Sequence, residues 1–269
     1  MVTNSEIVKA ENLTVGYAGK PVWHDASFSV KQGEFVAVIG PNGAGKTTMF
    51  RLLLGLQQPI GGKIEVFNAK PRRGNSKIGY VPQSHTIDDE TNIECVELVR
   101  LAYSANKWGF SLSPKKEKKA ALDALKAVGA TELARKSISS LSGGERQRIF
   151  LAEALVSNPE MLLLDESLSN LDIRRIKELV SLMNEVVKSR NVTAFLVAHD
   201  INPLIRFLDK VIYIANGKVA TGTPEEVLTS KRLSALYGTR VEVLRDSIGN
   251  IVVVGGEDPH EGEKHAIKS

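Results

Sequence analysis

Apolar and polar positions alternate over the first 85 residues, in short runs that glycine and asparagine interrupt. Such alternation predicts β-strands, because successive side chains of a strand point to opposite faces of a sheet. One stretch instead predicts a helix, Lys46–Leu54, which Gly55 is expected to end. The predicted strands are Ile7–Val8, Leu13–Tyr17, Ser27–Val30, Phe35–Ile39, Ile64–Phe67 and Ile78–Val81.

The pattern changes over residues 90–157, where charges become more frequent and apolar residues recur at helical spacing. Ser113 and Pro114 predict a helix start, with serine as the N-cap and proline in the first helical position. The charged segment Lys115–Lys119 is expected to be a solvated first turn, and Gly129 to end the helix. The apolar face consists of Ala121, Leu122, Leu125 and Val128. We therefore expect a mainly helical subdomain at about residues 90–157.

Residues 158–240 alternate between short apolar runs and an amphipathic segment, as a parallel sheet with helical crossovers would. Met161–Leu164 and Thr193–Val197 are almost wholly apolar, which is typical of strands buried on both faces. Arg174–Ser189 is the amphipathic helix predicted between them. The fold class is therefore predicted to be α/β.

The last part of the chain combines a hairpin signal with a polar end. Asn216-Gly217 lies between Val211–Ile214 and Lys218–Val219, which predicts a tight hairpin turn. Residues 241–269 are predicted to be a C-terminal extension, and its charged end from Gly255 onward is expected to be a loose tail.

Composition narrows the class of protein without naming a function. The chain has 269 residues, of which 42% are hydrophobic and 25% charged, as in ordinary globular proteins. Cys95 is the one cysteine, so no internal disulfide is possible, and a small buried apolar role is expected for it. No apolar stretch approaches the ~18 residues of a membrane span. The formal charge of +4 is explained by a solvated surface with a phosphate site, and no nucleic-acid-binding motif is present.

The segment Gly40–Thr48, here called the phosphate loop, fits the pattern G-x-x-x-x-G-K-[ST]. It lies between a predicted buried strand and a predicted helix, which is the context that this motif requires. Glycines let the loop turn its N–H groups toward one point, and the helix N-terminus adds further N–H donors. Lys46 can reach the β- and γ-phosphates and Thr47 can ligate Mg²⁺, whereas the alternative is a glycine-rich turn with a chance lysine. The candidate nucleotide-binding residues here are Gly40, Asn42, Gly43, Gly45, Lys46, Thr47 and Thr48.

Two acids, Asp165 and Glu166, follow the predicted buried strand Met161–Leu164. The C-terminal ends of strands are where open α/β sheets bind ligands. Asp165 can hold Mg²⁺ directly or through water, and Glu166 can polarise an attacking water. Two incidental surface acids are the alternative, but a buried strand does not tolerate them cheaply without metal or partners.

A second glycine-rich segment, Leu141–Glu145, precedes another predicted helix and is here called the signature segment. Ser142, Gly143 and Gly144 provide a hydroxyl and free N–H groups that can meet a phosphate. A flexible linker that only caps the helix is the alternative for this segment taken alone.

Together and in this order, the phosphate loop, the signature segment and the acidic strand end resemble those of ABC transporter ATP-binding subunits. The resemblance covers residues 6–240 and includes Tyr17, Gln83, His199 and the segment 169–172. It implies a P-loop ATPase cassette over residues 1–240, with a mixed core sheet, an antiparallel β-subdomain and a helical subdomain. It also implies ATP and Mg²⁺ as cofactors.

The resemblance assigns a role to each matching residue. It implies that Tyr17 stacks on adenine, that Gln83 touches Mg²⁺ and the attacking water, and that His199 contacts the γ-phosphate and holds Glu166. Asp172 would communicate across a dimer, in which the signature segment of one subunit covers ATP held by the other. Three alternatives remain open: Tyr17 packs on its strand, Gln83 is a plain loop amide, and His199 caps a helix that starts near Asp200.

One residue departs from the family pattern, since Ser167 stands where a proline usually follows the catalytic glutamate. Proline restricts the residue before it to extended angles, so serine is expected to hold Glu166 less rigidly. We therefore expect this departure to affect the rate of turnover and not the mechanism.

The cargo is indicated only indirectly. Ser84–Glu90, Cys95–Val99 and Trp108–Phe110 resemble the divalent-metal importer group, which handles manganese, zinc or iron. Iron-siderophore or vitamin B12 importers are the alternative, followed by a soluble ABC ATPase outside transport, while the signature segment opposes a P-loop kinase. His260 and His265 could sense metal, against the alternative of a solvated tail. The implied partners are a second copy or a homologous ATPase subunit, a membrane permease and, indirectly, a substrate-binding protein, at the cytoplasmic face of the membrane.

Overall fold

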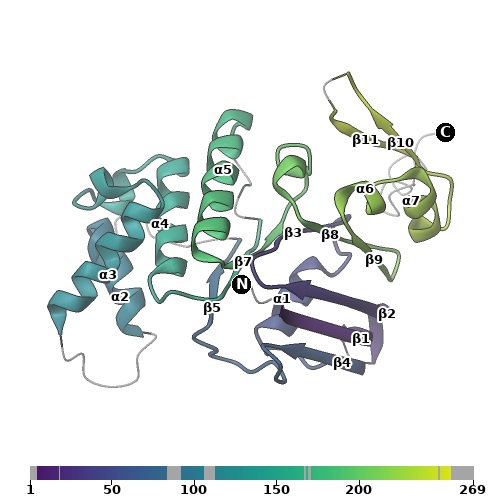
Figure 1. Ribbon diagram of the computed structural model, residues 1–269, viewed down its shortest axis with the longest axis horizontal. Helices are drawn as coiled ribbons and strands as arrows, with labels where there is room; N and C mark the ends of the chain where they lie inside the picture. Colours follow the sequence, from purple (N-terminus) through teal and green to yellow (C-terminus); the bar gives the residue numbers. More distant parts are fainter. Residues whose placement is uncertain are drawn as a thin grey trace, which may run out of the picture.

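The computed structural model describes residues 5–17, 19–83, 92–105, 113–166, 168, 171–247 and 249–255. Within these residues the strands form a six-stranded sheet, a three-stranded sheet and a two-stranded sheet. Figure 1 shows the helices α2, α3 and α4 gathered at one end of the molecule, and the sheets at the other. No helix of the described residues is both long and apolar enough to cross a lipid bilayer.

The central sheet has the strand order β5-β6-β7-β3-β8-β9, and each pairing is parallel except that of β8 with β9. The predicted strands Phe35–Ile39, Ile78–Val81, Met161–Leu164 and Thr193–Val197 are confirmed with these bounds. Their short apolar runs form strands of this sheet because both of its faces are covered. The strands are β3 (Phe35–Ile39), β5 (Ile78–Val81), β6 (Met161–Leu164), β7 (Thr193–Val197), β8 (Lys210–Ala215) and β9 (Lys218–Gly222).

Strand β3 shows how this sheet divides the core. Phe35, Ala37 and Ile39 belong to one buried cluster, which includes residues of the helices α2 to α5. Val36 and Val38 belong to a second cluster, which includes residues of the antiparallel sheet and the helix α1 (Lys46–Leu53). Alternate side chains of one strand thus serve two cores, so the sheet holds the strand ends rigidly in place.

The antiparallel sheet has the order β2-β1-β4, with β1 (Glu6–Tyr17), β2 (Lys20–Lys31) and β4 (Gly61–Val66). The prediction of two separate strands at Ile7–Val8 and Leu13–Tyr17 was wrong, because both belong to β1. Its register on β2 shifts between Ala10 and Leu13, and Asn12 has a φ of +45°. This irregularity interrupts the alternation of apolar residues without ending the strand.

The predicted helical segment contains α2 (Cys95–Ala105), α3 (Pro114–Ala127) and α4 (Gly143–Leu155), with short 3₁₀ turns at Thr131–Leu133 and Ile138–Ser140. The three helices pack against one another around buried apolar side chains, and Cys95 is buried as expected. The start of α3 after Ser113 is confirmed.

The charged first turn of α3 differs from its prediction at one residue. Glu117 is only 4% exposed, and its carboxylate accepts a hydrogen bond from Arg100 at 2.9 Å. Arg100 also donates to Glu97 at 2.8 Å. The arginine partner, which lies on α2, makes burial of this acid possible, so the turn is not solvated on all sides.

After β6 the chain forms α5 (Ile173–Arg190), which extends the predicted helix Arg174–Ser189 by one residue at each end, and later a 3₁₀ turn at Ile205–Phe207. The predicted hairpin at Asn216-Gly217 is confirmed as β8 and β9. It is followed by α6 (Pro224–Val227) and α7 (Ser230–Tyr237). A further hairpin that was not predicted joins β10 (Glu242–Arg245) to β11 (Ile251–Val254). The predicted division between residues 240 and 241 stays a prediction and falls between α7 and β10.

Candidate functional site

Four neighbouring parallel strands of the central sheet, β5, β6, β7 and β3, end at the same edge of the sheet. The segments that follow them carry Gln83, the pair Asp165 and Glu166, His199, and the phosphate loop. Because parallel strands place their C-terminal ends together, residues far apart in the sequence meet there. We call this set the strand-end centre.

The phosphate loop needs its glycines for two different reasons. Gly40, Gly43 and Gly45 have φ values of +148°, +76° and +100°, which side-chain-bearing residues avoid. A Cβ on Gly40 would also lie 2.0 Å from the carbonyl oxygen of Ile214, and one on Gly45 would lie 2.9 Å from the Trp23 ring. The predicted strand–loop–helix context is present, because β3 ends at Ile39 and α1 begins at Lys46.

Lys46 lies inside this loop, with 5% of its surface exposed. Its Nζ donates to the carbonyl oxygens of Gly40 and Pro41, both at 2.9 Å. Burial lowers the pKa of Lys46, and the nearby charges of Glu166 and Asp165 oppose this shift. The ammonium is therefore held where the loop curls around it, close to two carboxylates.

Asp165 is almost completely buried beside the start of α1. Burial, followed by the charge of Glu166, raises the pKa of Asp165, whereas the hydroxyls of Tyr80 and Thr47 act in the opposite direction. Its Oδ1 is buried and has no hydrogen-bond partner among the described residues. A carboxylate oxygen and a hydroxyl are ligands that Mg²⁺ prefers. Asp165 and Thr47 therefore fit the predicted magnesium site.

Gln83, Glu166 and His199 meet in one cluster. The Gln83 amide donates to Glu166 Oε2, and His199 Nε2 lies 3.1 Å from Glu166 Oε1. Glu166 has a φ of +46°, an uncommon conformation for a residue with a side chain. No helix begins at or next to Asp200, and the first helical turn after His199 is the 3₁₀ turn at Ile205–Phe207, so the alternative that His199 caps a helix near Asp200 is wrong. The alternative of a plain loop amide does not describe Gln83, which bonds to a carboxylate of the centre.

Tyr17 lies beside the first turns of α1, with 48% of its surface exposed. Its hydroxyl lies 3.2 Å from the Thr48 hydroxyl and accepts from Arg51 at 3.2 Å. The ring thus has an exposed surface next to the phosphate loop, which agrees with a stacking role. Sequence reasoning missed Arg51 and also Tyr80, whose hydroxyl lies 3.5 Å from Asp165. Both are single polar positions without a motif, so the sequence carries no signal for them.

The signature segment lies at the start of α4, away from the strand-end centre. The Glu145 carboxylate accepts from the Ser142 backbone at 2.9 Å and from its hydroxyl at 2.8 Å, which caps the helix. A Cβ on Gly144 would meet the Arg175 side chain, and Arg175 donates to Asp172, the N-cap of α5. Within the described residues, no hydrogen bond or ion pair joins Ser142, Gly143 or Gly144 to the phosphate loop.

Several sequence predictions fall outside the described residues. Ser167, Ser169 and Asn170 are among them, as are the segments 84–91 and 106–112, which contain two of the three segments that indicate the cargo. The tail histidines His260 and His265 are outside as well.

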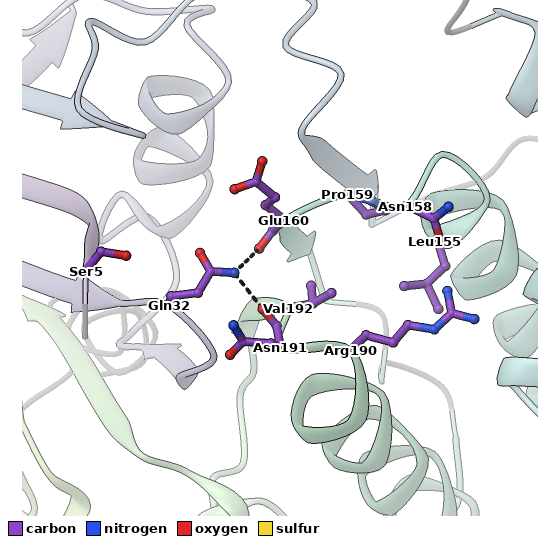
Figure 2. A pocket seen from close by; sticks show the side chains of 9 residues that line it. All are labelled: Ser5, Gln32, Leu155, Asn158, Pro159, Glu160, Arg190, Asn191 and Val192. Carbon is purple, nitrogen blue, oxygen red and sulfur yellow. Dashed lines mark hydrogen bonds between the residues drawn. The ribbon is translucent and has the colours of Figure 1, made fainter. Parts of the chain in front are cut away.

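A cavity of about 620 Å³ lies at the opposite edge of the central sheet. Figure 2 shows Gln32 between Glu160 and Asn191, and its amide donates to the backbone carbonyl of each. These residues and Val192 precede the strands β3, β6 and β7 rather than follow them. This cavity is therefore separate from the strand-end centre.

Fold and site together define a P-loop protein that binds a nucleotide at the carboxyl edge of a mixed sheet. The family described as ABC transporter matches residues 23–169 of this chain. The chain therefore belongs to the ABC transporter family, as an ATP-binding cassette with ATPase activity.

Three curated relatives agree with this assignment over nearly their whole length. The manganese transport system ATP-binding protein MntB of Bacillus subtilis (strain 168) is 34% identical, covering 90% of this chain and 96% of its own. The zinc transport system ATP-binding protein TroB of Treponema pallidum (strain Nichols) is 31% identical, covering 96% and 95%. The ferric enterobactin transport ATP-binding protein FepC of Escherichia coli (strain K12) is 32% identical, covering 92% and 93%.

Solved structures show the same fold. An ABC transporter in an inward-facing conformation contains a chain that is 28% identical, with a TM-score of 0.79 over 93% of this chain and 98% of that one. The dimeric cassette MJ0796, bound to ADP and phosphate, is 28% identical, with a TM-score of 0.67 over 80% of this chain and 98% of its own. The predicted cassette fold is thereby confirmed.

Proposed function

We propose that this chain energises the uptake of a divalent metal ion, manganese, zinc or iron, through a separate permease, with ATP hydrolysed at the strand-end centre. The observation that carries the catalytic part is the cluster of Gln83, Glu166 and His199 beside the phosphate loop. Catalysis in this class is mostly positioning and charge stabilisation around the γ-phosphate.

Each residue of the centre has a role in this proposal. The loop N–H groups and Lys46 hold the β- and γ-phosphates, while Tyr17 stacks on the adenine. Thr47, Gln83 and Asp165 would hold Mg²⁺, which supplies charge neutralisation at the phosphates when it is bound. Glu166 accepts a proton from the attacking water as the oxygen bonds to the γ-phosphorus and the bond to ADP breaks. His199 keeps the Glu166 carboxylate in place and contacts the γ-phosphate.

The second half of each site comes from a second copy of the chain. The dimeric relative supports this arrangement, as does the separation of the signature segment from the phosphate loop within one subunit. Ser142, Gly143 and Gly144 would close over ATP held by the partner, and Asp172 would transmit the contact between subunits. We place the dimer on the cytoplasmic side of the membrane, against a permease.

The catalytic test is Glu166→Gln, which keeps the shape of the side chain and removes the base. We expect hydrolysis to fall by about a hundredfold or more, because general bases contribute at least this much, while ATP binding persists and the dimer accumulates. Single-turnover hydrolysis and light scattering measure the two effects. Glu160→Gln is the matched control, since Glu160 pairs with Lys77 at the opposite edge of the sheet. Wild-type turnover in the Glu166 variant would remove Glu166 from the proposal.

The cargo is tested by elemental analysis of cells that carry Glu166→Gln in place of the wild-type chain, in metal-poor medium. A selective fall in manganese or zinc is expected, in keeping with the cargoes named for MntB and TroB. The second candidate is import of an iron-siderophore, which the similarity to FepC favours. A fall in iron alone would favour this second candidate if adding the siderophore to the medium did not restore the iron content of the cells. Unchanged metal contents would reject metal import.

A further inference from the structure

The side chain of Asn202 joins the loop that carries His199 to the unpredicted C-terminal hairpin. Its Nδ2 donates to the Ile251 carbonyl at 3.0 Å, and its Oδ1 accepts from the Ile251 N–H at 2.6 Å. Both main-chain polar groups of Ile251 therefore point away from β10, and the amide bonds to the outer edge of β11 as a neighbouring strand would. Such a paired contact fixes both position and orientation.

Asn202, on the other side of this contact, lies close to the strand-end centre. Asn202 lies three residues after His199, and its backbone N–H donates to the Asp200 side chain at 2.9 Å. This bond closes a tight turn, so a displacement of Asn202 is transmitted to His199. A cavity of about 370 Å³ is lined by Gly40, His199, Asn202 and Ile251, among others. The hairpin, the His199 loop and the phosphate loop thus face the same space.

The hairpin itself is anchored to the body of the protein. Ser234 of α7 accepts from the N–H of Val241 at 2.9 Å and donates to its carbonyl at 3.1 Å, and Ser230 accepts from Val243 at 2.9 Å. Figure 1 shows β10 and β11 beside α6 and α7, at the end of the molecule away from α2 and α3. The hairpin that Asn202 contacts is therefore itself held in place by α7.

We propose that Asn202 is a positioning residue for ATP hydrolysis, which holds His199 against Glu166 by tying its loop to the hairpin β10–β11. The inference rests on the proposed role of His199. The His199 ring is half exposed, so few neighbours surround it, and its distance from Glu166 depends on where the backbone of its loop is held. The C-terminal hairpin thereby becomes part of the support of the catalytic centre.

The test compares Asn202→Ala with Asn250→Ala in the full chain. Asn250 lies in the same hairpin next to Ile251, but its amide bonds to Asp246 in the turn, and within the described part of the chain it makes no hydrogen bond to the His199 loop. We expect Asn202→Ala to lower kcat by about tenfold, the usual effect of losing a support of a functional side chain, with KM for ATP within about twofold. Asn250→Ala should keep the wild-type kcat. A wild-type kcat in Asn202→Ala would overturn the inference.

A double-mutant cycle separates positioning from general stability. If Asn202 acts through His199, Asn202→Ala has no further effect in a His199→Ala background. If Asn202→Ala lowered kcat equally in both backgrounds, or weakened ATP binding in proportion to kcat, the inference would be overturned. Both results are what a merely structural role of Asn202 predicts. Asn202→Asp keeps the acceptor for the Ile251 N–H and should recover part of the rate.

The same variants distinguish the two proposals. A wild-type rate in His199→Ala would remove the proposed role of His199 and this inference with it. A slow His199→Ala beside a wild-type Asn202→Ala would reject this inference alone.

Discussion

The strand-end centre and the signature end of α4 each contain a glycine-rich segment at a helix N-terminus, yet they are built differently. In the strand-end centre, groups from four strands bond to one another, as Gln83 and His199 do to Glu166. At the start of α4, Ser142 and Glu145 bond to each other, and of the two glycines between them Gly143 is exposed and Gly144 lies next to the Arg175 side chain. The groups of the first region contact one another within one chain, whereas the start of α4 makes its contacts apart from them.

The largest difference between the two regions is expected when the Lys46 ammonium is removed from the strand-end centre. We expect Lys46→Ala to weaken ATP binding by about a hundredfold, because charge-assisted hydrogen bonds contribute about 1.5–3 kcal/mol each. Calorimetric titration with ATP measures the loss. Lys70→Ala, at an exposed lysine between β4 and β5, is the control and should bind as the wild type does. Undiminished affinity in Lys46→Ala would place the nucleotide elsewhere.

A mixing experiment tests whether the second region acts on a partner. Gly144→Val adds a branched side chain at the N-terminus of α4. We expect this variant to bind ATP but not to hydrolyse it. Mixed with Glu166→Gln subunits, it should form dimers in which one of two sites has every intact part. With random pairing of equal amounts, about a quarter of wild-type hydrolysis should return. No recovery above the separate variants would mean that both regions serve the same subunit.

Replacing a glycine by alanine should change the free energy of unfolding differently in the phosphate loop and at the start of α4. Gly45 has a φ of +100°, and its Cβ would lie 2.6 Å from Val22, so we expect Gly45→Ala to destabilise the fold by about 2 kcal/mol or more. Gly144 is helical, and its Cβ would come no closer than 3.4 Å to the Arg175 side chain. Gly144→Ala should therefore raise the free energy of unfolding by about 0.5–1 kcal/mol. Urea unfolding gives both values, and equal effects would contradict the comparison.

The smallest expected effect concerns pH. The Ser142 N–H and then its hydroxyl lower the pKa of Glu145, so this carboxylate adds stability above its ordinary pKa, and the gain is lost as pH falls through the lowered value. Burial raises the pKa of Asp165, so that acid reduces stability as pH rises from its ordinary pKa through the raised one. Glu145→Gln keeps an oxygen that can cap the helix and removes only the charge, so it should cost about 0.3–1 kcal/mol at pH 7, as the loss of a negative charge at a helix N-terminus does. Asp165→Asn should stabilise the fold at the same pH.

Unfolding curves measured from pH 3 to pH 8, roughly the range over which carboxylates titrate, check both signs. Glu185→Gln, at an exposed glutamate of α5, controls for a general change in charge. Stability changes of the same sign in the two variants would contradict the assignment.

Much of the strand-end centre could be predicted from the sequence because its parts are local. A short apolar run such as Phe35–Ile39 can only be buried, and the glycines and lysine directly after it leave few alternatives to a phosphate loop. Asp165 and Glu166 follow another such run, so their position at a sheet edge was predictable as well. Contiguous residues carry these signals, and no long-range contact is needed to recognise them.

Other features needed the folded chain. Asn12 looks like a break between two strands, but pairing on both sides of β1 carries the strand through it. Glu117 reads as a solvated charge until Arg100 from another helix meets it.

By itself, the sequence determined the α/β class, the three motifs and the order in which they occur, because each motif lies within a few consecutive residues. Only the tertiary structure decided which side chains meet: Gln83 with Glu166, and Asn202 with Ile251, which lie 83 and 49 residues apart along the chain. Contacts over such distances depend on strand order and on the packing of both faces of the sheet, and no local pattern encodes them.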